Sequence, residues 1–276
     1  MAGPFTGVPV GEALASARIA LEGAGVDTPR LDAEVLLAHA LGIDRARLVL
    51  ERDTPVEGPA IRAFQTAVRR RSVERVPVAY LTQTKGFRRL DLDVDPRVLI
   101  PRPDTEALVE WAVRRLPRGA RVVDVGTGSG AIALALKDER ADLELLATDV
   151  SAEALVVARA NARRLGLDVT FVEGDLLAGL DADAVLSNPP YVETGARLAP
   201  EITRHEPPGA LFAGPDGLDV LRRLVPAIAA SRARFAGLEV SAGQAAAVRA
   251  LFTAGWETDV GRDLGGVERV VSAWRG

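Results

Sequence analysis

One stretch decides the fold of this chain: Val122-Val123-Asp124-Val125-Gly126-Thr127-Gly128-Ser129-Gly130. Its first four residues are mostly apolar, as in a buried strand, and they run directly into a turn with alternate glycines. Glycine lets a backbone turn tightly and lets a ligand approach without meeting a Cβ atom. Open α/β sheets bind their ligands beyond the carboxyl ends of strands, where this turn lies. We therefore expect a ligand-binding turn at Gly126, Thr127, Gly128, Ser129 and Gly130.

The glycine spacing narrows the choice of ligand. A dinucleotide fingerprint has the form G-x-G-x-x-G and turns helix N–H groups toward a pyrophosphate. Here the glycines follow as G-x-G-x-G, and the third fingerprint position is Ala131. A second predicted strand ends in Asp149, whose carboxylate can accept hydrogen bonds from both hydroxyls of a ribose. The alternatives are a nicotinamide or flavin dinucleotide, which the spacing disfavours, and a turn without a ligand, which Asp149 disfavours.

Outward from this turn, the chain alternates strands with helices. Strands are predicted at 121–125, 143–148, 169–173, 182–187, 235–240, 256–260 and 267–273, and helices at 105–116, 130–137, 152–165, 218–230 and 244–254. Such alternation is typical of a mostly parallel sheet with helices on both faces. The predicted fold class is therefore α/β.

The first 75 residues have a helical pattern instead. Thr28-Pro29 is typical of a helix start, and Gly42 of a helix end. We expect residues 1–75 to form a small helical bundle. The run Arg69-Arg70-Arg71 closes one of its helices, and we expect it to be a solvated helix end; contact with a partner is the alternative.

A change of pattern separates the two regions. Leucine and valine alternate with aspartate over residues 90–94, which is typical of a strand. With 78–81 as its partner, this strand predicts a β-hairpin linker over residues 76–98. The α/β domain then occupies residues 99–276. Two prolines exclude regular structure at its beginning, and Asp104 is expected to cap the helix that follows.

A second candidate site is Asn188-Pro189-Pro190-Tyr191, directly after the predicted strand 182–187. In a doubly wound sheet the first and fourth strands flank the point where strand order reverses, so their loops open into one crevice. We expect this tetrapeptide to face the glycine turn. A proline-rich turn without function is the alternative.

Composition excludes several classes of protein. The chain has 276 residues, no cysteine and two histidines, so disulfides and thiolate chemistry are excluded and no metal site is expected. The formal net charge of −4 counts against a nucleic acid as the main substrate. The first ten residues lack the features of a signal peptide, and no apolar run is long enough to cross a bilayer. A cytoplasmic protein is expected.

The glycine turn and its surroundings resemble motif I of the class I methyltransferases, whose Rossmann-like sheet binds S-adenosyl-methionine. The resemblance implies that residues 126–130 cup the methionine part of this cofactor and that Asp149 binds its ribose. Asp175, after the third strand, would bind the adenine amino group, and Leu176 would pack on the adenine. We also expect Asn188 to contact the cofactor.

The tetrapeptide suits methylation of a planar nitrogen. The lone pair of an amide or aromatic amino nitrogen is delocalised, so acceptors for both N–H groups can aim that lone pair at the methyl group. The Asn188 side-chain oxygen and the Pro189 carbonyl are the candidate acceptors, and the two prolines stiffen the loop. Tyr191 offers a flat face for the substrate. The predicted catalytic residues are Asn188, Pro189 and Tyr191, and Pro190 joins them in binding the substrate.

Nearly the whole chain resembles the release factor glutamine methyltransferases, the PrmC/HemK family. Besides the two loops, the resemblance rests on Pro29 to Glu34, Ile100-Pro101-Arg102-Pro103-Asp104-Thr105-Glu106, Glu206-Pro207, Gly214 to Asp219, and Glu268-Arg269-Val270. It implies methylation of the glutamine in the Gly-Gly-Gln motif of class I peptide chain release factors. It also implies that the helical domain helps to recognise this protein partner.

Three alternatives remain at this point. A glutamine methyltransferase for a ribosomal protein shares the Asn-Pro-Pro-Tyr motif but usually lacks the Arg-Pro-Asp-Thr-Glu string. An adenine-N6 methyltransferase for nucleic acid is disfavoured by the acidic charge balance. A nucleotide-binding module without catalysis is disfavoured by Asn188 and Tyr191.

Overall fold

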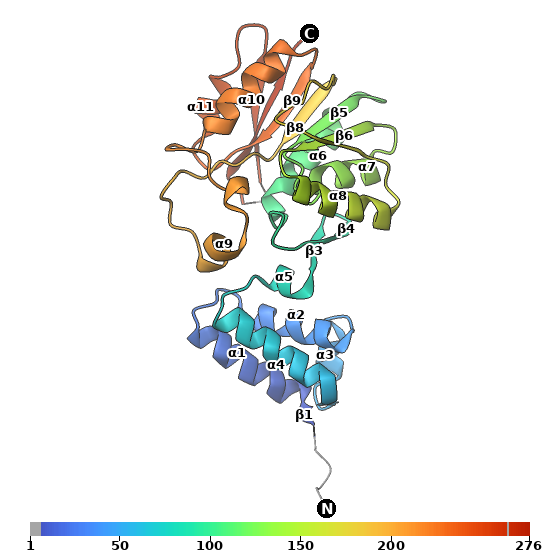
Figure 1. The fold of residues 1–276 in the computed structure, drawn as a ribbon, viewed down its shortest axis with the longest axis vertical. Coiled ribbons are helices and arrows are strands. Elements are labelled where there is room, and N and C mark those ends of the chain that lie inside the picture. The colour runs from blue at the N-terminus through green and yellow to red at the C-terminus, as the bar shows by residue number, and fades with distance from the viewer. Residues whose placement is uncertain (1–6, 264) are drawn as a thin grey trace, which may run out of the picture. The chain divides into compact units, whose positions relative to one another are not determined.

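The chain folds into two compact units. A computed structural model describes residues 7–263 and 265–276. The smaller unit consists of the residues up to Gln83 together with Ala199–His205, and the larger unit of Thr84–Leu198 together with Glu206–Gly276 (Figure 1). Residues 1–6, part of the stretch in which no signal peptide is expected, lie outside the described residues. No helix in the described ranges has both the length and the apolar character that a bilayer crossing needs.

The smaller unit is helical. Its elements are β1 (Val8–Pro9), α1 (Val10–Gly23), α2 (Pro29–Leu41), α3 (Arg47–Leu50), β2 (Pro55–Val56), α4 (Gly58–Ser72), α5 (Val78–Thr82) and α9 (Pro200–His205). Helices α1, α2 and α4 enclose an apolar core that includes Leu21, Leu37 and Phe64. The predicted ends of α2 are confirmed, because Pro29 lies in its first turn and Gly42 follows its last with a left-handed φ of 65°.

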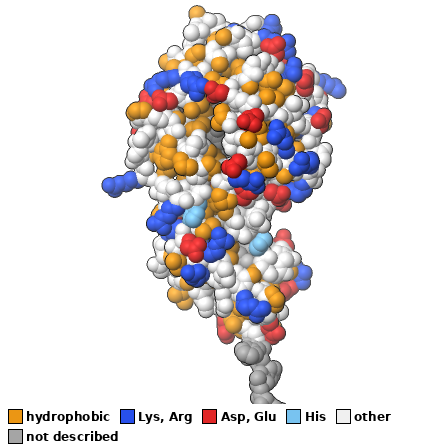
Figure 2. Space-filling view, in the orientation of Figure 1, with side chains coloured by type: hydrophobic (Ala, Val, Ile, Leu, Met, Phe, Trp, Pro, Cys, Tyr) orange, Lys and Arg blue, Asp and Glu red, His pale blue; other side chains and the backbone are white. Residues whose placement is uncertain are grey.

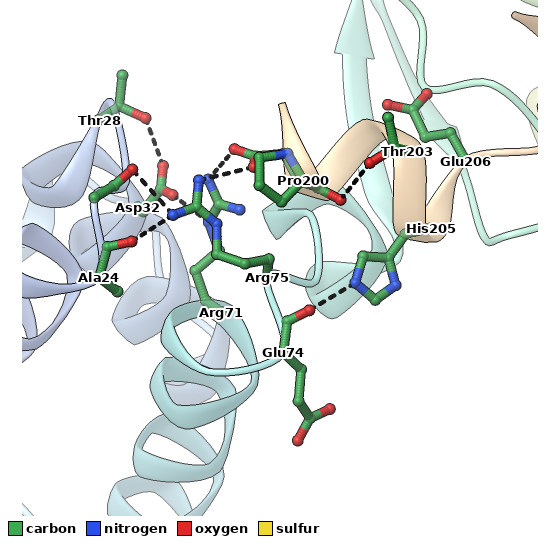
Figure 3. A network of polar contacts seen from close by, with 12 residues as sticks. Ala24, Thr28, Asp32, Arg71, Glu74, Arg75, Pro200, Thr203, His205 and Glu206 are labelled. Carbon is green, nitrogen blue, oxygen red and sulfur yellow. Dashed lines mark hydrogen bonds and ion pairs between the residues drawn. The ribbon is translucent and has the colours of Figure 1, made fainter. Parts of the chain in front are cut away.

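Helix α9 belongs to this unit although it lies far along the chain. Glu201 accepts from Arg71 Nη2 at 3.1 Å and from Arg75 Nη2 at 2.8 Å. His205 Nε2 donates to the carbonyl oxygen of Glu74 at 2.8 Å (Figure 3). Arginines on α4 and just after it thus hold a carboxylate that is separated from Arg71 by 130 positions in the sequence.

The expectation of a solvated arginine run was wrong for Arg71. Its side chain is 7% exposed, and its Nε donates to Asp32 Oδ2 on α2 at 2.7 Å. The Thr28 hydroxyl donates to the other oxygen of Asp32 at 2.7 Å. Arg71 is buried because it neutralises two carboxylates at once, one from α2 and one from α9. Arg69 and Arg70 do lie on the surface.

The predicted hairpin exists with a different first strand. Strands β3 (Thr84–Phe87) and β4 (Leu90–Asp93) pair antiparallel, and both belong to the larger unit. The segment 78–81, expected as a strand, is instead the helix α5 of the smaller unit. A short apolar run cannot be assigned by periodicity alone, and Pro77 favours a helix start here. The segment 76–98 is therefore divided between the two units.

The larger unit is built on a seven-stranded sheet. Its further elements are η1 (Pro103–Thr105), α6 (Glu106–Arg115), β5 (Arg121–Val125), α7 (Ala131–Glu139), β6 (Glu144–Asp149), α8 (Ala152–Leu165), β7 (Thr170–Glu173), β8 (Ala184–Ser187), η2 (Pro208–Ala210), α10 (Asp219–Ala230), β9 (Phe235–Glu239), α11 (Ala245–Arg249), β10 (Glu257–Arg262) and β11 (Glu268–Trp274). The strand order is β10-β11-β9-β8-β5-β6-β7, with parallel pairing from β9 to β7 and an antiparallel β11.

Helices cover both faces of this sheet. Successive strand residues point to opposite faces, so Val122 belongs to the core cluster that includes residues of α6, α7 and α8, and Val123 to the cluster that includes residues of α10 and α11. Figure 1 shows these helices packed around the sheet. The predicted mostly parallel α/β sheet is confirmed. The predicted reversal of strand order is confirmed as well, because β5 lies between β6 and β8. Val125 and Ser187 are register partners, so the glycine turn and the Asn-Pro-Pro-Tyr loop leave the sheet side by side.

Arg71 provides a test of the ion-pair cluster in the smaller unit. Replacing it by methionine (Arg71→Met) removes the arginine that both Asp32 and Glu201 contact while keeping much of the apolar stem. We expect the local free energy of unfolding to fall by about 3 kcal/mol, as for other broken buried pairs. Amide hydrogen exchange in α2 and α4 measures this local stability. Arg69→Met is the matched control, because the Arg69 side chain is 71% exposed, and equal effects of both substitutions would contradict the assignment.

Candidate active site

The glycine turn has a backbone that only glycine adopts without strain. Gly126, Gly128 and Gly130 have φ angles of 73°, 56° and 87°. The N–H groups of Gly126 and Thr127 both donate to the Thr148 carbonyl oxygen, at 2.8 and 2.9 Å. Beside Gly126 and Gly128, the position of a Cβ has no protein atom within 4 Å. The turn is thus fixed to β6 on one side and presents open backbone on the other, as a cofactor cradle requires.

Asp149 fastens the turn from the end of β6. Its Oδ2 accepts from the Gly128 N–H at 2.9 Å, and its Oδ1 accepts from the Ser151 N–H at 2.9 Å. Ser151 in turn caps α8 by accepting from Ala154 N. Each carboxylate oxygen has a further lone pair, and the side chain is only half-buried. Asp149, the residue predicted to bind the ribose, therefore lies against the glycine turn and has lone pairs left to accept further hydrogen bonds.

Two buried polar side chains that were given no role in the sequence analysis also hold the turn. Asp124 Oδ2 accepts from the Thr127 hydroxyl at 2.7 Å and from Ala133 N at 3.3 Å. Burial raises the pKa of Asp124 to about 7. Asn161 Nδ2 donates to the Ser129 carbonyl oxygen at 3.0 Å. Asp124 had a sequence signal, since it interrupts an apolar strand, whereas Asn161 on α8 had none.

Asp175 and Leu176 follow β7 at the same edge of the sheet. The Thr148 hydroxyl donates to the Leu176 carbonyl oxygen at 2.7 Å, so the residue that receives the glycine turn also fixes this loop. Leu176 has a φ of 49° and is partly buried against the core. Asp175 is paired with Arg223 of α10, and both side chains are more than half exposed. The structure therefore brings residues 126–130, Asp149 and this loop to one edge.

The Asn-Pro-Pro-Tyr loop is held at its first residue. The Ser187 hydroxyl donates to the Val125 carbonyl oxygen at 2.7 Å, which ties the end of β8 to the end of β5. Asn188 Nδ2 donates to Thr105 Oγ1 at 3.0 Å. Because the amide nitrogen faces Thr105, the Asn188 side-chain oxygen is left as an acceptor. This orientation is the one that the predicted role of Asn188 requires.

The loop is held equally firmly at Tyr191. The tyrosine hydroxyl donates to Glu239 Oε1 at 3.2 Å, and burial raises its pKa. The Tyr191 carbonyl oxygen accepts from Gln244 Nε2 at 3.1 Å. Gly217 approaches so closely that a Cβ there would lie 2.1 Å from this carbonyl oxygen. Tyr191 is therefore fixed through its backbone and through its hydroxyl.

Glu239 is a further residue at this site that sequence reasoning missed. It ends β9, is fully buried, and burial raises its pKa to about 7. The available signal was an acid at the end of an otherwise apolar strand, Phe235-Ala236-Gly237-Leu238-Glu239. A pattern of this kind does not say which residues the acid faces, because Thr105 and Tyr191 lie far away in the sequence.

The Pro-Arg-Pro segment is tied down by ion pairs. Glu206 accepts from Ile100 N at 3.2 Å and from Arg102 Nη2 at 2.5 Å. Asp104 pairs with Arg269 of β11 at 2.9 Å and makes no cap, so the expectation that it caps the next helix was wrong. The chain enters α6 through the 3-10 turn η1, which places the Thr105 side chain in the interior.

This arrangement combines two abilities at neighbouring strand ends. One loop offers open glycine backbone and a carboxylate, which suit a ribose-containing cofactor. The other offers an oriented amide oxygen and stiff backbone carbonyls, which suit a substrate with N–H groups to donate. The two loops begin at adjacent positions, Gly126 and Asn188, one strand spacing apart.

Two family models match the chain. The PrmC N-terminal domain matches residues 12–82, and the methyltransferase small domain matches residues 103–205. Among curated relatives, "Release factor glutamine methyltransferase" of Deinococcus radiodurans is 44% identical over 271 residues, covering 95% of this chain and 97% of the relative. The protein of the same description from Mycolicibacterium smegmatis is 47% identical over 219 residues, covering 77% of each chain.

A solved structure with a similar fold is a methyltransferase from Pyrococcus furiosus. Its TM-score is 0.52 at 18% identity, and the match covers 68% of this chain and 89% of that one. At this identity the likeness concerns the fold alone.

The contact between Gly217 and Tyr191 can be tested with two alanine substitutions. Gly217 and Gly243 both have left-handed φ angles, 74° and 85°, but only Gly217 has close neighbours. We expect Gly243→Ala to lower the free energy of unfolding by about 1 kcal/mol through backbone strain. Gly217→Ala should cost roughly 1–3 kcal/mol more, because the new methyl group displaces the Tyr191 carbonyl. Urea denaturation measures both, and equal losses would mean that the loop yields freely at Tyr191.

Proposed function

Because the chain belongs to the family of release factor glutamine methyltransferases, we propose that it transfers a methyl group from S-adenosyl-methionine to a glutamine side-chain nitrogen of a release factor. The two family models and the curated relatives confirm the family resemblance inferred from the motifs. The observation that carries the proposal is the pairing of β5 with β8, which sets a cofactor cradle beside an oriented asparagine amide.

The cofactor supplies a sulfonium methyl group that is already activated for transfer. We assign the methionine part to residues 126–130, the ribose to Asp149 and the adenine amino group to Asp175, with Leu176 against the adenine. The open backbone at Gly126 and Gly128 supports the first assignment, and the free lone pairs of Asp149 support the second. The exposed ion pair of Asp175 with Arg223 contributes little stability, so this carboxylate is available for exchange.

The acceptors for the substrate amide come from the second loop. We assign one N–H of the glutamine side chain to Asn188 Oδ1 and the other to the Pro189 carbonyl, with Pro190 and Tyr191 lining the planar amide. Held in this way, the nitrogen lone pair is turned out of conjugation and toward the methyl group. The N–H groups become stronger donors as the nitrogen becomes positive, so these acceptors act mainly on the transition state. The protonated amide product is a strong acid, and water can take its proton.

The protein partner is proposed to be a class I peptide chain release factor, with the Gly-Gly-Gln glutamine as the acceptor. We assign its recognition in part to the smaller unit, which the PrmC N-terminal family model covers at residues 12–82. On the face of the molecule drawn in Figure 2, basic and acidic side chains are interspersed. Together with the net charge of −4, this favours a protein over a nucleic acid as substrate. Release factors act where translation takes place, so the proposed compartment is the cytoplasm.

Isotope transfer tests the substrate. With S-adenosyl-methionine labelled in its methyl group, we expect label to enter a class I release factor and to vanish when the glutamine of its Gly-Gly-Gln motif is replaced by alanine. Ribosomal protein and duplex DNA serve as competing acceptors. Stronger labelling of either one would reject the release factor as the main substrate.

Asn188 is the residue on which the proposed mechanism depends most. Asn188→Ala removes one preorganised acceptor, so turnover in a single-turnover assay should fall by roughly 10²–10³. Affinity for S-adenosyl-homocysteine, measured by calorimetry, should stay nearly constant, because the acceptor oxygen serves the substrate. Asn188→Asp retains an acceptor and should keep partial activity. Near-normal turnover of Asn188→Ala would mean that the Asn-Pro-Pro-Tyr loop is only a turn without a catalytic role.

A further inference from the structure

Glu239 occupies a position where a carboxylate is costly. It ends β9, the strand between β8 and β11, and is fully buried. Its Oε2 is buried without a hydrogen-bond partner among the described residues. A neutral or apolar side chain would fill this space without the desolvation of a charge. The presence of a carboxylate at this position therefore indicates a role that a neutral side chain could not perform.

Two hydroxyl groups favour the charged form of this carboxylate. Tyr191 donates to Oε1 at 3.2 Å, and the Thr105 hydroxyl also stabilises the charged form. The other charged groups nearby are Asp104 of η1, which opposes the negative charge, and Arg269 of β11, which favours it. Both hydroxyls thus come from the segments that carry the motifs of this family, the Pro-Arg-Pro segment and the Asn-Pro-Pro-Tyr loop.

Thr105 interacts with both Glu239 and Asn188, so the direction of its hydroxyl hydrogen decides which end of the Asn188 amide it can contact. A threonine hydroxyl has one hydrogen to donate and two lone pairs to accept. A carboxylate is a stronger acceptor than a neutral amide oxygen, so we expect the Thr105 hydrogen to point to Glu239, whose charged form this hydroxyl stabilises. Thr105 Oγ1 then has only lone pairs for Asn188, and it must face the amide nitrogen, as it does at 3.0 Å.

We propose that Glu239 is a positioning residue that, through Thr105, turns the Asn188 side-chain amide so that its oxygen faces the substrate. The proposal rests on the proposed function of Asn188 as acceptor. Without the carboxylate, the Thr105 hydroxyl is free to donate to the Asn188 oxygen, and the amide turns over to present N–H groups. The N–H groups of Asn188 then face the N–H groups of the substrate glutamine, and two donors repel each other. The same carboxylate also fixes the ring of Tyr191 through its hydroxyl.

Glu239→Gln tests this role with almost no change of shape. The glutamine N–H group donates to Thr105, so Thr105 donates to Asn188. We expect turnover to fall roughly 10- to 100-fold, as for other residues that orient a reacting group. Affinity for S-adenosyl-homocysteine should change less than about twofold, because the assigned cofactor site does not include Glu239. Glu257→Gln, on the exposed strand β10, is the matched control.

Thr105 variants separate positioning from packing. Thr105→Val removes the hydroxyl at constant shape and should lower turnover to the level of Glu239→Gln. The double variant should be no slower than either single one, because both break the same chain of contacts. Thr105→Ser retains the hydroxyl and should restore most of the turnover. Additive losses, or a loss in Thr105→Ser equal to that in Thr105→Val, would overturn the proposal in favour of packing.

The pH profile gives a signature that a structural role does not share. Burial raises the pKa of Glu239 to about 7, so the charged form is the less stable one in the folded protein. Glu239 therefore stabilises the folded state while it is protonated, and this contribution to the free energy of unfolding is lost as the pH rises from about 4.5 through about 7. Turnover should rise over the same range, because only the carboxylate accepts from both hydroxyls. Loss of this rise in Glu239→Gln is expected, and an unchanged profile would overturn the proposal.

A readout without substrate distinguishes this proposal from the proposed function. The side-chain amide protons of Asn188 can be followed by NMR in the full-length enzyme with S-adenosyl-homocysteine. We expect their signals to shift in Glu239→Gln and Thr105→Val and to stay in place in Thr105→Ser and Glu257→Gln. Shifts without any methylation of a release factor would refute the proposed substrate alone. Unshifted signals in Glu239→Gln would refute the positioning role alone.

Discussion

Parallel pairing of β5 with both β6 and β8 is the constraint on which the rest of this site depends. Three strand ends then lie at one edge of the sheet, and each releases a loop with a different chemistry. The end of β6 supplies both the Thr148 carbonyl that receives the glycine turn and the Asp149 carboxylate that fastens it. The end of β8 supplies Asn188, in the position next to the turn. Neither loop has a defined partner until the strand order is set.

Buried polar groups perform the fine positioning on this frame. Asp124 and Asn161 hold the glycine turn, and Glu239 holds the Asn-Pro-Pro-Tyr loop through the Tyr191 hydroxyl. Each buried carboxylate disfavours its own charged form, since burial raises both pKa values to about 7. The fold therefore gives up some stability above neutral pH at the two places where its loops must be held in a single orientation.

The smaller unit incorporates a piece of the chain that follows the second loop. After Tyr191 the chain leaves the larger unit at Leu198, forms α9 in the smaller unit and returns at Glu206. Glu201 is held by Arg71 and Arg75 of the smaller unit, and Glu206 by Ile100 and Arg102 of the larger unit. The segment that carries the proposed substrate acceptors is thus covalently continuous with the unit proposed to recognise the release factor.

The amino-acid sequence by itself determined the strand and helix alternation, the glycine turn and the stiff loop at Asn188. These features depend on local backbone geometry, because glycine permits a left-handed φ, proline fixes one, and apolar periodicity marks which face is buried. Only the tertiary structure decided that Thr105 faces Asn188, that Glu239 faces Tyr191 and that Arg71 is buried. Their partners lie 83, 48 and up to 130 positions away, so strand order and helix packing choose them. The short run 78–81 became a helix for a related reason, since four apolar residues fit either element and their neighbours in space decide.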